Sequence, residues 1–210
     1  MRLIKILKFR RVTMLYKIVR LTLSLFFHSY IRLDTIGHRN IPGSGGVILA
    51  PNHISYLDPL LLGVAVKRKV YSMAKEDLFK NAILRFVMTH LKAFPVKRGK
   101  IDRYALKRSL QILNQGKLLN VFPEGTIPLN SNTTEGKPGV AWLALKANVP
   151  VVPVKIIGSE KLLPDGKVFP RMGRARIVFG QPISFETNDN SYKKNRKKIS
   201  EKIMEEIEKL

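Results

Sequence analysis

Short apolar runs alternate with longer amphipathic segments along most of the chain. Apolar runs bounded by turn residues are typical of buried strands. They predict strands at Val47–Ala50, Val70–Ala74, Ala93–Lys97, Leu118–Phe122, Val151–Ile157 and Ala175–Phe179. Helical patterns lie between them at Pro59–Val66, Asn81–Leu91, Asp102–Asn114 and Val140–Ala147. This alternation predicts an α/β fold with a mixed, largely parallel sheet flanked by helices.

Two details mark the ends of predicted helices. Asp102 is placed to cap the start of the third helix, and Gly116 is placed to stop it. Near the carboxyl terminus, Ile199, Ile203 and Ile207 recur every four residues among charges of both signs. That pattern predicts an amphipathic surface helix between residues 193 and 210.

The first 33 residues differ from the rest, because basic and large apolar residues are interleaved and no acid occurs. The longest uncharged run, Leu21–Ile31, has eleven residues. A membrane-spanning helix needs about 20. On a helix the polar residues fall on one narrow stripe and apolar residues cover most of the remainder; the stripe comprises Thr13, Lys17, Arg20, Ser24 and His28.

A basic, mostly apolar helix suits the interface of an anionic membrane leaflet. We therefore predict a helical membrane-interface anchor over residues 1–33 and an α/β domain over residues 34–210. The protein would then sit at the cytoplasmic face of the cell membrane as a peripheral or monotopic protein. The alternative is a pair of helices packed on the protein's own core.

Composition narrows the choice of partner. The 210 residues include 38 Lys and Arg but only 15 Asp and Glu, which gives a formal net charge of +23. Such an excess indicates an anionic partner: nucleic acid, an acidic membrane surface or an acidic ligand. The chain has no cysteine. Disulfides, thiolate nucleophiles and Cys-ligated metals are therefore excluded.

Several common catalytic motifs are absent from the sequence. It contains no phosphate-binding loop of the G-x-x-x-x-G-K-[ST] type, no G-x-G-x-x-G after a strand and no G-x-S-x-G nucleophile elbow. The four histidines, at positions 28, 38, 53 and 90, do not have zinc-ligand spacing. No metal site is predicted.

A histidine and an aspartate follow the first predicted strand, in Asn52-His53-Ile54-Ser55-Tyr56-Leu57-Asp58. Ligands of α/β sheets bind at the carboxyl ends of strands. There His53 could take a proton from a hydroxyl while Asp58 fixes its tautomer. No Ser or Cys nucleophile is evident, so the hydroxyl would belong to the substrate, which suggests direct acyl transfer. The plainer alternative makes His53 a loop residue and Asp58, before Pro59, a helix N-cap.

Two other predicted strands end in polar residues. Phe94-Pro95-Val96-Lys97-Arg98 ends in cations, and Arg98 is suited to a phosphate but also to solvated surface. Phe122-Pro123-Glu124-Gly125-Thr126 ends in a tight turn. Glu124 could accept a hydrogen bond from a substrate hydroxyl, hold Arg98 in place or serve as a structural acceptor.

Taken in order, these blocks resemble those of the glycerolipid acyltransferases. The blocks are Asn52–Asp58, Phe94–Arg98, Phe122–Thr126 and Val149–Val154, and the resemblance covers about residues 35–185. It implies that the domain over residues 34–210 is catalytic. It further implies that His53 is the general base for an sn-2 hydroxyl and that Asp58 orients it.

The resemblance also implies an acceptor site and a reaction. The implied substrate-binding residues are Arg98 for the glycerol phosphate together with Glu124, Gly125, Thr126 and Lys137, and Pro153 would shape the far wall or acyl channel. The implied reaction moves a fatty acyl group from a thioester to 1-acyl-glycerol 3-phosphate (lysophosphatidic acid), forming phosphatidic acid for phospholipid synthesis. No cofactor is implied, and the donor would be acyl-coenzyme A or acyl carrier protein.

The chain departs from the family pattern at three positions. Ile127 stands where the family usually has Arg after Glu-Gly-Thr, and Lys137 or another nearby cation would have to replace it. Lys92 stands where Gly is usual, and Lys97 where an acidic or variable residue is common. These departures concern phosphate binding and leave the reaction class unchanged.

Three alternatives stay open on the sequence. The acceptor could be glycerol 3-phosphate or another lysolipid, or the chain could be an inactive membrane-surface scaffold. A basic nucleic-acid-binding protein is also compatible with the charge. Against it, the basic amino terminus is interleaved with Leu, Ile and Phe, and no helix-turn-helix, RRM-like or zinc-finger signature appears.

Overall fold

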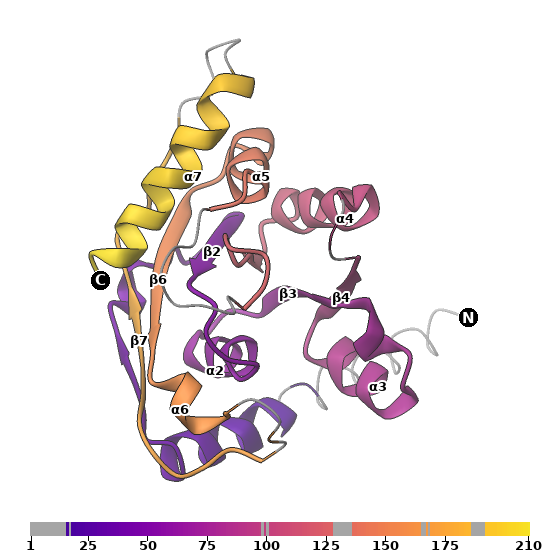
Figure 1. Cartoon of the computed structure of the whole chain (residues 1–210), viewed down its shortest axis with the longest axis vertical. Coiled ribbons are helices and arrows are strands. Elements are labelled where there is room, and N and C mark those ends of the chain that lie inside the picture. The colour runs from indigo at the N-terminus through magenta and orange to yellow at the C-terminus, as the bar shows by residue number, and fades with distance from the viewer. Residues whose placement is uncertain are drawn as a thin grey trace.

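The computed structural model describes residues 16, 18–97, 99, 101–127, 136–164, 167, 169–185 and 192–210. Within these residues the chain forms a seven-stranded sheet in the order β1-β7-β6-β2-β5-β3-β4 (Figure 1). The strands are β1 Leu33–Ile36, β2 Val47–Pro51, β3 Val70–Lys75, β4 Ala93–Val96, β5 Leu118–Asn120, β6 Val151–Ile157 and β7 Ala175–Phe179. Every neighbouring pair of these strands is parallel except β6–β7. The predicted mixed, largely parallel sheet is confirmed.

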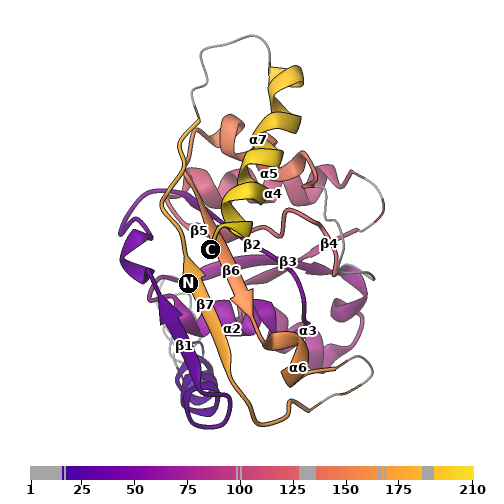
Figure 2. The same ribbon diagram turned by 60° about the vertical axis from the view of Figure 1, so that its left-hand side comes forward.

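Helices cover both faces of the sheet. They are α2 Asp58–Ala65, α3 Ala82–His90, α4 Arg103–Asn114, α5 Gly139–Ala147, α6 Ser159–Leu162 and α7 Tyr192–Glu208, with short 3-10 helices η1 His38–Asn40 and η2 Glu76–Phe79. A further helix covers residues 18–29. Helices α4, α5 and α7 lie on one face, whereas α2, α6 and the helix over residues 18–29 lie on the other (Figures 1 and 2).

Strand β2 shows how the sequence builds both layers of core. All its residues are buried, and successive side chains point to opposite faces of a strand. Val47 and Leu49 join the core under α2, while Ile48 and Ala50 join the core under α4 and α5. A strand buried on both faces needs a continuous apolar run, which is the pattern that predicted it.

The ends of α4 follow the predicted signals. The Asp102 carboxylate accepts a hydrogen bond from the Ala105 N–H at 3.0 Å, so Asp102 caps the helix. Gly116 has a φ of +69°, the left-handed conformation in which a glycine ends a helix without strain. The predicted carboxyl-terminal helix is confirmed as α7, and its Ile203 and Ile207 are fully buried in the core.

The helix over residues 18–29 has two unlike sides. Phe27, just before the end of the helix, and Ile31, just after it, belong to the buried core. The outward side carries Ile18, Leu21 and Leu25, which are 56%, 62% and 64% exposed. We call these three residues the outer apolar stripe. No helix in the described part of the chain is long and apolar enough to span a membrane.

Part of the predicted anchor, including Thr13 and Lys17, falls outside the described residues. Of the predicted polar stripe, the Arg20 guanidinium donates to the carbonyls of Val66 and Lys67 at the end of α2. One side of the helix is therefore tied to the domain. The anchor and the division at residue 33 stay predictions.

Candidate active site

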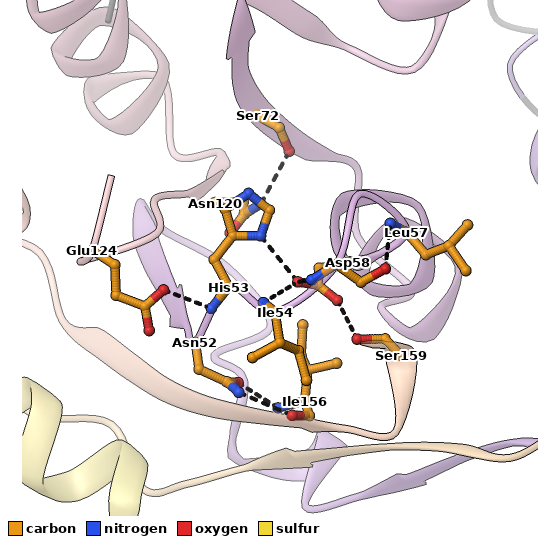
Figure 3. Close-up of polar contacts among 11 residues, drawn as sticks. Asn52, His53, Ile54, Leu57, Asp58, Ser72, Asn120, Glu124, Ile156 and Ser159 are labelled. Atoms are coloured by element: carbon orange, nitrogen blue, oxygen red, sulfur yellow. Dashed lines mark hydrogen bonds and ion pairs between the residues drawn. The ribbon is translucent and has the colours of Figure 1, made fainter. Parts of the chain in front are cut away.

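The carboxyl ends of three neighbouring strands converge at one place. Strands β6, β2 and β5 lie side by side and run parallel, so the loops that follow them meet at the same edge of the sheet. His53 and Asp58 follow β2, Glu124 follows β5 and Ser159 follows β6 (Figure 3). Strand order therefore assembles groups that lie up to 106 positions apart in the chain, as His53 and Ser159 do.

His53 and Asp58 form a buried pair. His53 Nδ1 lies 3.0 Å from Asp58 Oδ2, and the two side chains are 5% and 0% exposed. A carboxylate only accepts hydrogen bonds, so this contact assigns the proton of the neutral ring to Nδ1. Nε2 then carries the lone pair that can take a proton. The ring also stacks on Phe122, with centroids 3.8 Å apart, which fixes the plane of the imidazole.

The carboxylate of Asp58 turns back onto its own loop. Oδ2 accepts the backbone N–H groups of Ile54 and Ser55 at 2.8 Å each. The N-cap of α2 is Leu57, and no side chain caps this helix. The alternative in which Asp58 is a helix N-cap is therefore wrong, because the loop that carries His53 engages Oδ2 and Ser159 engages Oδ1.

Asn52 fastens this loop to the neighbouring strand. Its side-chain NH2 donates to the Ile156 carbonyl at 2.9 Å, and its Oδ1 accepts the Ile156 N–H at 2.6 Å. Its backbone N–H donates to the Val154 carbonyl at 3.3 Å. The amide thus imitates one more strand residue and prolongs the pairing of β2 with β6. This pairing sets the position from which the chain turns into His53.

Glu124 is the second buried acid beside the histidine. It is 6% exposed, and its Oε2 accepts the backbone N–H of His53 at 2.9 Å. Burial raises the pKa of Glu124 from 4.5 to about 7, and the nearby Asp58 carboxylate acts in the same direction. The hydrogen bond from His53 opposes this rise. Glu124 is consequently divided between its neutral and charged forms near neutral pH.

The turn after Glu124 brings Lys137 into place. Gly125 has a φ of +73°, and a Cβ built on it would lie 2.9 Å from Lys137 Nζ. The Lys137 N–H donates to the Pro123 carbonyl at 2.8 Å. The backbone conformation therefore favours glycine at position 125, and the flexible end of the Lys137 side chain lies against it. The Lys137 ammonium therefore lies beside the turn in which Ile127 takes the place of the arginine that is usual in the family.

The remaining expected residues are placed less directly. Thr126 is exposed at the end of the same turn, and Ile127 after it is half-buried. Pro153 is buried within β6 opposite Ala50, and its part in an acyl channel stays a prediction. Arg98 lies outside the described residues, so its contact with phosphate also stays a prediction.

Sequence reasoning gave no role to three residues that hold the pair: Asn52, Phe122 and Ser159. Asn52 and Phe122 belong to the quoted blocks, so their adjacency to His53 and Glu124 was a usable signal. Ser159 carried no such signal. It lies 101 positions from Asp58, and its hydroxyl donates to Asp58 Oδ1 at 2.6 Å.

Comparison with known proteins tests the family expected from the four blocks. Residues 32–157 match the family model described as Acyltransferase. This chain belongs to the acyltransferase family. The match includes His53, Asp58 and Glu124, and it confirms the family that the ordered blocks predicted.

Relatives of this acyltransferase carry more specific names. A 1-acyl-sn-glycerol-3-phosphate acyltransferase of Bacillus subtilis is 28% identical over 69% of this chain and 70% of the relative. A chloroplastic protein of the same name from Brassica napus is 27% identical over 89% of this chain, which spans 55% of that relative. The crystal structure of the 1-acyl-sn-glycerophosphate acyltransferase PlsC of Thermotoga maritima superposes with a TM-score of 0.69 at 25% identity, covering 93% of this chain and 81% of PlsC.

Proposed function

We propose that this acyltransferase moves a fatty acyl group from a thioester to the sn-2 hydroxyl of 1-acyl-glycerol 3-phosphate. The product is phosphatidic acid, a precursor in phospholipid synthesis. The observation that carries the proposal is the buried contact of His53 Nδ1 with Asp58 Oδ2 at 3.0 Å. The names of the relatives and of the PlsC structure support this acceptor.

The pair performs the transfer without a covalent intermediate. His53 Nε2 takes the proton of the acceptor hydroxyl while the hydroxyl oxygen attacks the thioester carbonyl. Asp58 stabilises the imidazolium that forms. When the tetrahedral intermediate collapses, the C–S bond breaks and the imidazolium returns the proton to the departing sulfur. One ester and one free thiol result.

Acceptor binding is assigned to the turn after β5 and the cations near it. Lys137 Nζ beside Gly125 supplies a positive charge for the glycerol phosphate in place of the arginine missing at Ile127. Arg98 adds a second cation, as the resemblance implies. Glu124 and Thr126 complete the acceptor site. The neutral form of Glu124 can donate a hydrogen bond and the charged form can accept one.

The donor and the membrane complete the proposal. Acyl-coenzyme A and acyl carrier protein are both anionic, so a chain with a net charge of +23 suits either. The reaction needs no cofactor. The outer apolar stripe and the basic amino terminus would hold the enzyme on the anionic cytoplasmic leaflet, where its acceptor lipid is dissolved.

Product analysis tests the function. Purified full-length protein is mixed with anionic vesicles containing lysophosphatidic acid, and acyl-coenzyme A or acyl carrier protein thioester is added. Phosphatidic acid and free thiol should appear in equal amounts. Formation of thiol without phosphatidic acid would contradict acyl transfer to this lipid.

A competition among acceptors separates the remaining alternatives. Half-buried Ile127 in the usual place of an arginine gives a specific reason to include glycerol 3-phosphate and phosphate-free lysolipids. Preference for lysophosphatidic acid supports the proposal, and faster transfer to another acceptor overturns its substrate. Absence of transfer to any acceptor favours a scaffold, and salt-sensitive DNA binding without vesicle binding favours a nucleic-acid partner.

A further inference from the structure

We propose that Ser159 is a positioning residue for acyl transfer, because its hydroxyl holds the second carboxylate oxygen of Asp58 and so orients His53. This inference rests on the proposed role of the His53–Asp58 pair. Ser159 Oγ donates to Asp58 Oδ1 at 2.6 Å, and both residues are fully buried (Figure 3). A contact this short to an ionised acceptor is among the stronger hydrogen bonds in proteins.

The two oxygens of Asp58 are held from different parts of the chain. Oδ2 receives His53 Nδ1 and the N–H groups of Ile54 and Ser55, all from the loop after β2. Oδ1 receives the hydroxyl of Ser159, which is the first residue of α6, just after β6. The terminal torsion of an Asp side chain has only broad preferences. Donors on both oxygens therefore fix the plane of the carboxylate and, through Oδ2, the direction of the imidazole.

The fold places Ser159 rigidly enough for this purpose. Gly158, which ends the turn after β6, has a φ of +85°, and a Cβ built there would lie 2.6 Å from the Arg174 carbonyl oxygen. On the other side, Leu162 of α6 is packed in the core at 2% exposure. Ser159 is held between these two fixed points. The contacts between Asn52 and Ile156 tie β6, the strand before Ser159, to the loop that carries His53.

A capping role does not account for the hydroxyl. The N-cap of α6 is Gly158, and no side chain caps this helix. The Ser159 hydroxyl has one proton, and that proton goes to the carboxylate, which can only accept. Its position is thus explained by Asp58 and not by the helix that carries it.

Removing the hydroxyl should change how the pair binds protons. In Ser159→Ala, Oδ1 is buried without its donor, so the negative charge of Asp58 is less stabilised. The first proton to reach the pair on acidification is then bound at higher pH, whichever of the two groups takes it. Glu124, itself near Lys155 and Glu208, is the other acid that acts on this site. It keeps its own contacts in the variant.

The test compares Ser159→Ala with Ser109→Ala in the full-length protein. Ser109 is an equally buried serine whose hydroxyl bonds to the Ala105 carbonyl within α4, away from the site. The first readout is the titration of the His53 ring by NMR, which needs no substrate. We expect the apparent pKa of the pair to rise in Ser159→Ala and to stay unchanged in Ser109→Ala.

The second readout is transfer to lysophosphatidic acid in vesicles. We expect kcat of Ser159→Ala to fall about 10- to 100-fold, as for loss of a group that orients a catalytic side chain. KM should not change, the acid limb of the pH profile should move to higher pH, and Ser159→Thr should recover part of the rate. A common fall in Ser159→Ala and Ser109→Ala, with neither titration nor pH profile moved, would overturn the inference.

The two readouts keep this inference separate from the proposed function. A shifted titration in a protein that acylates no lipid would refute the function and retain the contact of Ser159 with the pair. If Ser159→Ala does not fold, Ser159→Cys, which keeps a weaker donor of similar size, is used in both measurements. Its titration should move in the same direction by a smaller amount, and an unmoved titration would overturn the inference.

Discussion

The side chains around His53, at the carboxyl-terminal edge of the sheet, and those of the outer apolar stripe differ in where their interaction partners are found. At the edge, charged and polar side chains are buried and paired with one another: Asp58 alone accepts four hydrogen bonds. In the stripe, Ile18, Leu21 and Leu25 are each more than half exposed. The edge finds its partners within the chain. The stripe has its apolar surface facing outward, where the membrane proposed above would cover it.

The two regions therefore differ in which interactions stabilise them. A buried carboxylate is tolerated only when hydrogen-bond donors replace water, and the donors to Asp58 also fix the carboxylate that orients His53. Among the described residues, Asn120 Oδ1 is the one buried side-chain polar atom that lacks a hydrogen-bond partner. Apolar surface contributes about 25 cal/mol per Å² of stabilising free energy, and only when it is removed from water. The stripe therefore contributes little until something covers it.

Replacing Asp58 is the strongest way to break the buried arrangement. In Asp58→Asn the side chain can offer its NH2 to His53, which favours the wrong tautomer of the ring. We expect kcat to fall by up to about 10⁴-fold. The rate of phosphatidic acid formation measures this. Asp34→Asn, which alters an exposed ion pair with Arg176, is the control and should keep full activity. Comparable rates in the two variants would remove Asp58 from the mechanism.

Replacing Glu124 tests the cost of burying an acid at the edge. Because burial raises the folded-state pKa of Glu124 to about 7 from 4.5, the folded protein binds the proton more tightly than the unfolded chain. The resulting stabilisation is complete below about pH 4.5 and is lost as the pH rises through 7.

Glu124→Gln lacks this titration. Relative to the unmodified protein, the variant should gain up to about 3 kcal/mol in free energy of unfolding between pH 4.5 and pH 8. Urea denaturation at both pH values measures the gain. A difference between the two proteins that does not depend on pH would show that Glu124 is not buried in its neutral form.

Making the outer stripe polar tests the opposite region. The triple change of Ile18, Leu21 and Leu25 to Ser should reduce partition onto anionic vesicles by at least about tenfold, because less apolar surface enters the interface. Vesicle sedimentation measures this. Ile36→Ser alters a half-exposed apolar residue of β1 and should leave partition unchanged. Equal binding of the triple variant would refute the role of the stripe.

Lys92 gives the smallest expected effect, at the link between α3 and β4. It has a φ of +64°, a conformation that glycine adopts without strain and that explains why glycine is usual there. Lys92→Gly should raise the free energy of unfolding by about 0.5–1 kcal/mol. Lys92→Ala loses the same ammonium above the Tyr16 ring but keeps the strain. Thermal denaturation should find no gain in the Ala variant, and an equal gain in both would assign the effect to charge.

Local patterns predicted most of the elements but not the way they meet. The apolar runs located β2 to β7: β2, β5 and β6 are buried over several consecutive residues, whereas β3, β4 and β7 are buried only in part. Strand β1 was missed, because apolar and polar residues mix in its four-residue sequence Leu-Asp-Thr-Ile. It is an outermost strand of the sheet and is held by pairing with β7. Helix α6 has four residues and too little sequence for a period to show.

The site was predictable only as far as its blocks are local. His53 and Asp58 are five positions apart, so their contact could be expected from spacing. The position of Glu124 beside His53 needed the order β6-β2-β5, which no single segment encodes. Ser159 needed that order and the turn at Gly158 together. Asp58 before Pro59 favoured a helix cap, and the buried loop overrode that local preference.

The proposed mechanism makes His53 the base that activates the acceptor hydroxyl. The most direct measurement is the rate of phosphatidic acid formation by His53→Ala, with thermal denaturation as a check that the protein is folded. We expect kcat to fall about 10²- to 10⁴-fold in a folded protein. A folded His53→Ala that keeps a rate close to that of the unmodified protein would show that His53 is not the base.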